Sequence, residues 1–73
     1  MKDPNLEMLI AHSDSAMETF VVSLKIYKSI CNNKHYPKKD IIDFRKDVVA
    51  PNARALDTAV AHIKLYKLQA GYI

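Results

Sequence analysis

Apolar side chains line two sides of the first predicted helix, and this feature constrains the fold more than any other in the chain. One row alternates steps of four and three residues and consists of Leu6, Ile10, Ser13, Met17, Phe20, Leu24, Tyr27 and Cys31. That spacing keeps a row on one side of a helix, as in antiparallel helical pairs. A second row lies roughly opposite, at about 100° of turn per residue, and consists of Met8, Ala11, Val22, Ile26 and Ile30. One further helix of the same chain covers only one side, so the second row predicts a docking surface for another molecule.

Capping residues predict where this first helix begins and ends. Asp3 is a good N-cap, and Pro4 suits the first helical position because its missing N–H costs nothing there. The helix is expected to end near Cys31, with residues 32–33, two asparagines, in left-handed geometry at its C-cap. Residues 34–37 form a short connector, and a connection this short predicts two antiparallel helices packed side by side.

The second predicted helix spans residues 38–70, is opened by Pro37, and contains a proline at its centre. Its apolar face, for a continuous helix, consists of Ile41, Ile42, Val48, Val49, Leu56, Ala59, Val60, Ile63, Tyr66 and Ala70. Pro51 removes one backbone hydrogen bond and clashes with the carbonyl of Asp47, at a cost of about 3 kcal/mol in a regular helix. Because the apolar phase is the same on both sides, we predict one helix kinked at Pro51. The alternative is a third helix that starts at Pro51, with Ala50 as a poor N-cap.

The sequence therefore predicts an all-α fold, an antiparallel helical hairpin that forms a single domain over residues 1–73. One glycine and three prolines supply few turn signals, which argues against a sheet protein. The single cysteine, Cys31, cannot form an internal disulfide and suits a reducing compartment. The sequence has neither an apolar run of about 18 residues nor the apolar core of a signal peptide, so we expect a cytoplasmic protein without a membrane span.

Residues that could carry catalysis or bind a cofactor are scattered. The histidines, His12, His35 and His62, lack partners at metal-ligand spacing, and the only glycine, Gly71, marks the end of the second helix and cannot form a phosphate loop. The carboxylates show no pair fixed by local spacing for acid–base chemistry. We expect no enzymatic activity, no metal and no other cofactor.

Charge is distributed unevenly along the chain, whose net charge is +3. Residues 1–24 are acidic, whereas residues 25–46 are rich in lysine and arginine. A basic end of this kind attracts nucleic acid or an acidic partner. Only Tyr36 is interleaved for base stacking, so the pattern favours a solvated turn, and nucleic-acid binding is not expected.

The outward apolar rows supply the candidate partner contacts. These residues are Met8, Val22, Ile26, Ile30, Ala61, Leu65 and Leu68. Covering most of Val22, Ile26 and Ile30 is worth roughly 4–8 kcal/mol before the costs of binding. We therefore expect a protein that works by binding another protein.

A run in the second helix adds a resemblance to a known family. The run is Ala53-Arg54-Ala55-Leu56-Asp57-Thr58-Ala59-Val60-Ala61-His62-Ile63. It resembles the second helix of the small type III secretion cochaperones of the YscE/PscE/EscE kind. The chain length, the helical hairpin and the short basic connector are also similar to those of that family. The resemblance implies a bacterial cytosolic protein that pairs with a tetratricopeptide-like, helical-repeat chaperone and, through it, keeps the needle subunit monomeric before export. The chain departs from the family at residues 40–44, where a glutamine-rich start is replaced, and at Pro51.

Two other functions fit the same pattern. A small dimeric regulator could bind nucleic acid through its basic turn end, with two hairpins forming a four-helix bundle. A homodimeric anti-repressor or enzyme inhibitor would bury the second apolar row against its own copy. The free protein is a candidate homodimer in either case.

Overall fold

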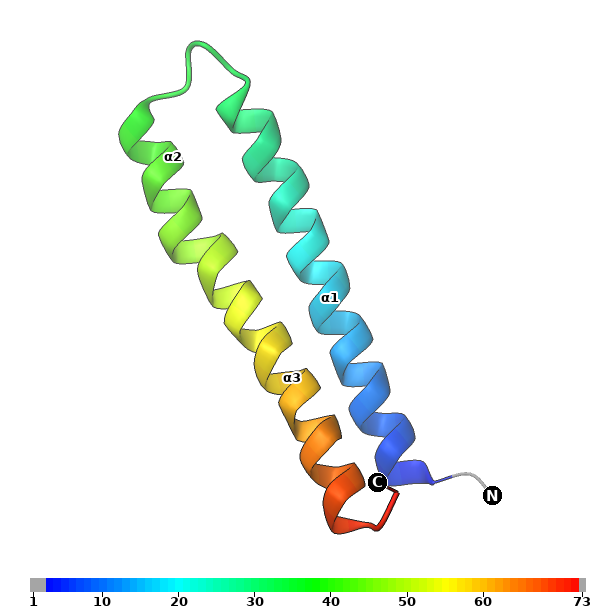
Figure 1. The fold of residues 1–73 in the computed structure, drawn as a ribbon. Coiled ribbons are helices and arrows are strands. Elements are labelled where there is room, and N and C mark those ends of the chain that lie inside the picture. The colour runs from blue at the N-terminus through cyan, green and yellow to red at the C-terminus, as the bar shows by residue number, and fades with distance from the viewer. Residues whose placement is uncertain (1–2, 73) are drawn as a thin grey trace.

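The computed structural model describes residues 3–72 and consists of two long antiparallel helical columns (Figure 1). The first is α1 (Pro4–Cys31), and the second runs through α2 (Lys38–Phe44), the π-helical turn η1 (Arg45–Val49) and α3 (Ala50–Gln69). The predicted all-α antiparallel hairpin is confirmed, and no strand occurs within the described residues. The molecule is a rod of 54 × 17 × 14 Å.

The start of α1 follows its capping signals, but its end does not. The Asp3 carboxylate accepts hydrogen bonds from the N–H groups of Asn5 (3.0 Å) and Leu6 (3.3 Å), and Pro4 is the first helical residue. The predicted left-handed cap at residues 32–33 is wrong, since Asn32 has φ −84° and ψ −6°. The Asn33 side chain instead accepts the N–H of His35 at 3.0 Å, and this local turn satisfies the connector without left-handed backbone.

The second column passes through Pro51 without a break. Both Phe44 and Ala50 have right-handed helical backbone, and the N–H of Ala50 donates to the carbonyl of Arg45, five residues back. This wider turn stands immediately before Pro51, where a regular α-helix would press the proline ring against a carbonyl. The prediction of one continuous helix is confirmed over a third helix starting at Pro51. Pro37 has extended backbone and precedes the first helical residue, Lys38.

The residues of each column that face the other column form what we call the seam. On α1 the seam differs at every second position from the first apolar row, which was predicted to face the second helix. The least exposed residues of α1 are Leu6, Leu9, Ser13, Ala16, Phe20, Ser23, Tyr27 and Ile30. Ile10, Met17, Leu24 and Cys31 were predicted at these positions because their side chains are larger, but they are exposed. Alternate steps of three and four residues allow either choice, and close approach of two helices favours the set that contains the smaller side chains.

The seam of the second column also differs from the predicted one. It consists of Ile41, Phe44, Val48 and Val49 before Pro51, and of Asn52, Ala53, Leu56, Ala59, Ile63 and Tyr66 after it. Ile42, Val60 and Ala70 were expected on this face and are exposed. A single neighbouring helix covers only a narrow stripe, so residues one step to the side of it stay in water.

Very little of the molecule is fully buried. Among the described residues only Ser23 and Ala59 are buried, with 3% and 2% of their surface exposed. The Ser23 hydroxyl donates to the carbonyl of Phe20 at 2.7 Å, so its burial leaves no unsatisfied group. Small side chains thus mark the places where the two columns approach each other, and large ones are left at the rims.

Candidate partner-binding surface

The hairpin exposes more surface than a compact protein of its mass. Its accessible surface is 5904 Å². A compact monomer of 8.3 kDa exposes about 4600 Å², so the excess is about 1300 Å². Large apolar side chains contribute to this excess on both flanks of α1. The candidate binding site is therefore an exposed apolar surface, and it has two distinct parts on α1.

The first part, which we call the groove face, carries most of the predicted contact residues of α1. Met8, Val22 and Ile26 are 69%, 48% and 46% exposed. Between Met8 and Val22 lies an open hollow of about 240 Å³. It is lined by His12, Ser15, Ala16 and Thr19 of α1 and by Asn52 and Ala55 of α3.

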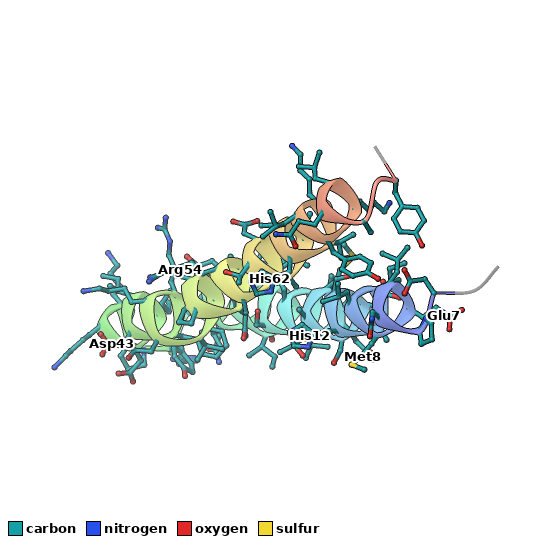
Figure 2. The ribbon with its side chains drawn as sticks, turned by 90° about the horizontal axis from the view of Figure 1, so that it is seen from below. Glu7, Met8, His12, Asp43, Arg54 and His62 are labelled. Carbon is teal, nitrogen blue, oxygen red and sulfur yellow. The ribbon has the colours of Figure 1, made fainter. Side chains whose placement is uncertain are left out.

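Helical spacing places the hollow and these apolar residues on one flank of α1. Ser15 is seven residues, or two turns, from both Met8 and Val22, and Thr19 is two turns from Ile26. Met8 and His12 project from the same outer side of α1 (Figure 2). The groove face is therefore a small-residue depression with an apolar side chain toward each end of the helix.

The walls of the hollow explain why it is empty of side chains. Ala16 and Ala55 are too short to fill the space between the two columns, and the Thr19 hydroxyl turns back to donate to the carbonyl of Ser15 at 3.0 Å. Sequence reasoning missed this hollow. The signal for it was the group of small residues at Ser15, Ala16 and Thr19, opposite Ala55 in an antiparallel register.

The remaining predicted contacts separate into two places. Ala61, Leu65 and Leu68 follow one another at about one-turn intervals and are exposed on the side of α3 that faces away from α1. Ile30 is half-buried in the seam, so its assignment to an outward row is wrong. The seam includes Ile30 because it continues the steps of three and four through Ser23 and Tyr27.

The second part of the surface, the Met17 row, lies on the opposite flank of α1. It consists of Ile10, Met17, Val21 and Leu24, which are 41%, 52%, 41% and 39% exposed. Ile10, Met17 and Leu24 are spaced by two turns each, and Val21 fills the gap between the last two. Val60 of α3 is exposed on the side of its helix away from Ala55, next to this row. Ile10, Met17 and Leu24 were assigned to the seam from sequence, and the structure leaves them uncovered.

The open end of the hairpin is closed by a cluster of polar side chains, which we call the clasp. One carboxylate oxygen of Asp3 accepts hydrogen bonds from the hydroxyls of Tyr66 (2.6 Å) and Tyr72 (2.8 Å). These bonds hold the pKa of Asp3 below its usual value, and they raise the pKa of Tyr66 and of Tyr72 because a deprotonated hydroxyl could not donate. The other oxygen caps α1, so a single carboxylate joins both ends of the described chain.

Gly71 brings Tyr72 into the clasp. Gly71 has φ +82°, and the N–H of Tyr72 donates to the carbonyl of Lys67 at 2.8 Å, while that of Gly71 donates to Leu68 at 3.4 Å. This is a Schellman motif, in which a left-handed residue reverses the chain after the last helical turn. The prediction that Gly71 ends the second helix is confirmed, whereas the contact from Tyr72 to Asp3 had no local sequence signal.

The turn end holds aromatic and basic side chains. The rings of Tyr27 and Phe44 stack with centroids 6.5 Å apart and an angle of 5° between planes. The basic side chains of this end are all exposed: Lys25, Lys28, Lys34, Lys38, Lys39, Arg45 and Lys46. Asp40, Asp43 and Asp47 are interleaved with them, and Tyr36 is half-buried. Acidic and basic side chains are therefore mixed at this end of the hairpin.

Within residues 3–72, no group of three or more histidine, cysteine, aspartate or glutamate side chains is arranged to hold a metal ion. No helix in this part of the chain is long and apolar enough to cross a membrane. His12 and His62 are both exposed on the helix surfaces.

Comparison of the chain with protein-family models, with curated proteins and with solved structures finds no match.

Proposed function

We propose that this protein is a cochaperone without enzymatic activity whose groove face docks onto a helical partner chain. The supporting observation is that Met8, Val22 and Ile26 remain about half exposed or more on one flank, on either side of a hollow lined by small residues. Helical partners bind through side chains spaced by one or two turns that enter depressions between neighbouring residues. The groove face offers such a depression, with apolar contacts before and after it.

The hollow suits an apolar side chain of the partner. Its volume of about 240 Å³ exceeds what one large aliphatic side chain occupies, and Ala16 and Ala55 form an apolar floor. Burying most of the exposed area of Met8, Val22 and Ile26 contributes about 3–5 kcal/mol before the costs of association. An anchor residue in the hollow supplies the remainder in the way that interface hot spots do.

The resemblance to the small type III secretion cochaperones gives this partner a specific form. On that basis the partner is a tetratricopeptide-like chaperone, and the complex keeps the needle subunit monomeric in the bacterial cytoplasm before export. The helical hairpin and the exposed apolar rows support a role of this kind, in which a small protein stabilises a larger helical-repeat protein. The partner in turn covers surface that the hairpin cannot cover itself.

Co-expression with the chaperone and needle subunit of a type III secretion system tests the proposal. Ile26→Asp is expected to abolish co-purification with the chaperone, because it places a charge in the groove face. Ile42→Asp is the matched control, since Ile42 is equally apolar, is exposed on α2 and lies outside this face. Ala55→Phe, which fills the hollow, is expected to weaken the complex as well. A complex that forms equally with all three variants would show that the groove face is not the docking surface.

A further inference from the structure

We propose that a second copy of this chain docks on the Met17 row, with α1 antiparallel to α1 of its partner and a two-fold axis passing beside Met17. The groove face and the Met17 row lie on opposite flanks of α1, so this interface is separate from the one proposed for the cochaperone partner. It does not depend on that function. The argument rests on the charge pattern of the row and on the exposed area.

A two-fold axis would place the acidic end of the Met17 row against the basic end of the same row in the second copy. Glu7, Asp14, Val21 and Lys28 follow one another at two-turn intervals along the edge of the row, so its start is acidic and its end is basic. In an antiparallel pair centred near Met17, the register that sets Met17 against its own copy sets Ile10 against Leu24. The same register sets Glu7 opposite the residue next to Lys28, which leaves the two charged side chains within reach of each other. Opposite charges then meet at both ends of the interface, and apolar side chains meet between them.

The same pattern disfavours a parallel pair. With two copies of α1 side by side in the same direction, Glu7 would meet Glu7 and Lys28 would meet Lys28. Like charges in such positions are destabilising. The polarity extends beyond the row, because residues 7–18 of α1 carry its acidic groups and residues 25–28 its lysines. Antiparallel pairing therefore brings acidic halves onto basic halves along the whole helix.

The Met17 row is long enough for a dimer interface. A specific protein interface of standard size buries about 800 Å² on each partner. The excess surface of this hairpin over a compact protein of equal mass is about 1300 Å² in total, and the Met17 row is one part of it. The segment from Glu7 to Lys28 spans about 30 Å of helix, which is long enough for an interface of that size. Methionine at the axis suits this position, because its flexible side chain adapts to contact with a copy of itself.

Sedimentation or light scattering on the full chain tests the stoichiometry. The wild type is expected to have twice the mass of the 8.3 kDa chain, with a dissociation constant in the micromolar range. Met17→Glu places two carboxylates at the axis and is expected to give a monomer. Val22→Glu is the matched control on the opposite flank and is expected to remain a dimer. Circular dichroism reports whether each variant is still helical.

Charge reversal tests the register. Glu7→Lys and Lys28→Glu are each expected to weaken the dimer about tenfold, because each turns two attractive contacts into repulsive ones. The double variant is expected to restore the wild-type affinity. Glu7 and Lys28 are six turns apart in one hairpin, so restoration requires contact between copies.

A disulfide test depends on neither charge nor dissociation. Met17→Cys in a Cys31→Ser background is expected to form a covalent dimer on mild oxidation, because the two-fold axis brings the two sulfurs together. Val22→Cys in the same background is expected to stay reduced.

Three results would overturn the proposal: a wild type that is monomeric at about 100 µM, a dimer that Val22→Glu disrupts and Met17→Glu does not, or a double charge reversal that fails to recover affinity. Loss of the chaperone complex in Met17→Glu, with a monomeric wild type, would assign the row to the heteromeric partner instead.

Discussion

The two ends of the hairpin are held together by different physical interactions. At the open end, the Asp3 carboxylate accepts hydrogen bonds from Tyr66 and Tyr72, residues that lie 63 and 69 positions away in the sequence. At the turn end, a short connector joins the columns and the rings of Tyr27 and Phe44 stack. The turn end is thus held by chain connectivity and apolar contact, and the open end by directional bonds that depend on protonation. We expect the two ends to respond differently to insertion, truncation and pH.

The largest expected difference concerns the deletion of one residue from the second column. The seam of the second column contains Ile41, Phe44, Val49, Asn52 and Leu56. If one residue of η1 is left out of the count, the steps between these positions are three, four, three and four residues. Deleting Lys46 together with Pro51→Ala therefore converts the column into a regular helix in the correct register. We expect this variant to melt within a few degrees of the wild type.

Deleting Arg54 in the Pro51→Ala background is the matched control. Arg54 lies in regular α-helix, and its loss rotates every later seam residue by about 100°. Leu56, Ala59 and Ile63 then leave the seam, and we expect a loss of about 4 kcal/mol of unfolding free energy. Chemical denaturation measures both variants. Equal damage from the two deletions would show that η1 is not a one-residue insertion.

The aromatic stack is expected to have the next largest effect. Tyr27→Ala removes a half-buried ring from the seam and its contact with Phe44, and we expect a loss of about 2–3 kcal/mol. Tyr27→Phe keeps the ring and should remain close to the wild type. Equilibrium unfolding in urea distinguishes the two. A small effect of Tyr27→Ala would mean that the connector alone holds the turn end.

The clasp predicts a stability that falls at both extremes of pH. The pKa of Asp3 is lowered from 3.8, so its contribution is present above that pH and is lost as the pH falls through the folded value. The pKa values of Tyr66 and Tyr72 are raised from 10.0, so their contribution is present below pH 10 and is lost as the pH rises through the folded values. We expect a melting temperature that is flat between these limits and falls outside them.

The double variant Tyr66→Phe, Tyr72→Phe isolates this contribution. It removes both hydroxyls and retains the rings, so its melting temperature should be lower than that of the wild type on the plateau and should converge on it above pH 10. Tyr36→Phe is the control, because Tyr36 lies at the turn end. A difference between wild type and double variant that does not change with pH would contradict the role of Asp3 as acceptor.

The smallest expected effect is that of Gly71→Ala. A side chain at φ +82° costs about 1 kcal/mol, and no neighbouring atom lies within 4 Å of where it would stand, so the cost is conformational alone. Gly71→Asn should cost less, since asparagine tolerates this backbone better. Thermal denaturation compares the two. If alanine and asparagine behave alike, the motif does not control the position of Tyr72.

Sequence patterns predicted the helices of this protein better than the contacts between them. The pair Asp3-Pro4 determined the start of α1, and the apolar residues on both sides of Pro51 indicated one continuous column. The predicted phase was not preserved, because η1 inserts one residue before Pro51. Both inferences rest on local backbone chemistry, which a short segment contains in full. The seam of α1 was wrong at Ile10, Met17 and Leu24 because size favours burial only where there is room for it.

The candidate surface was predicted in part for the same reason. Met8, Val22 and Ile26 are exposed as expected. Ile30 belongs to the seam instead, whereas Ile10, Met17 and Leu24, which were assigned to the seam, are exposed. Close packing selects Ala16 and Ser23 for the interior, and hydrophobicity alone does not predict that selection. The contact between Asp3 and Tyr72 depends on the register of the whole hairpin, which no local pattern specifies.

The thinness of the rod also determines how its backbone exchanges hydrogen with the solvent. Because only Ser23 and Ala59 are enclosed among residues 3–72, the amide protons there are shielded by helical hydrogen bonds far more than by depth. Deuterium should therefore enter both columns at rates set mainly by distance from the helix ends. A companion molecule bound along one flank would slow that uptake on the helices it covers, and its position could be mapped without knowing what it is.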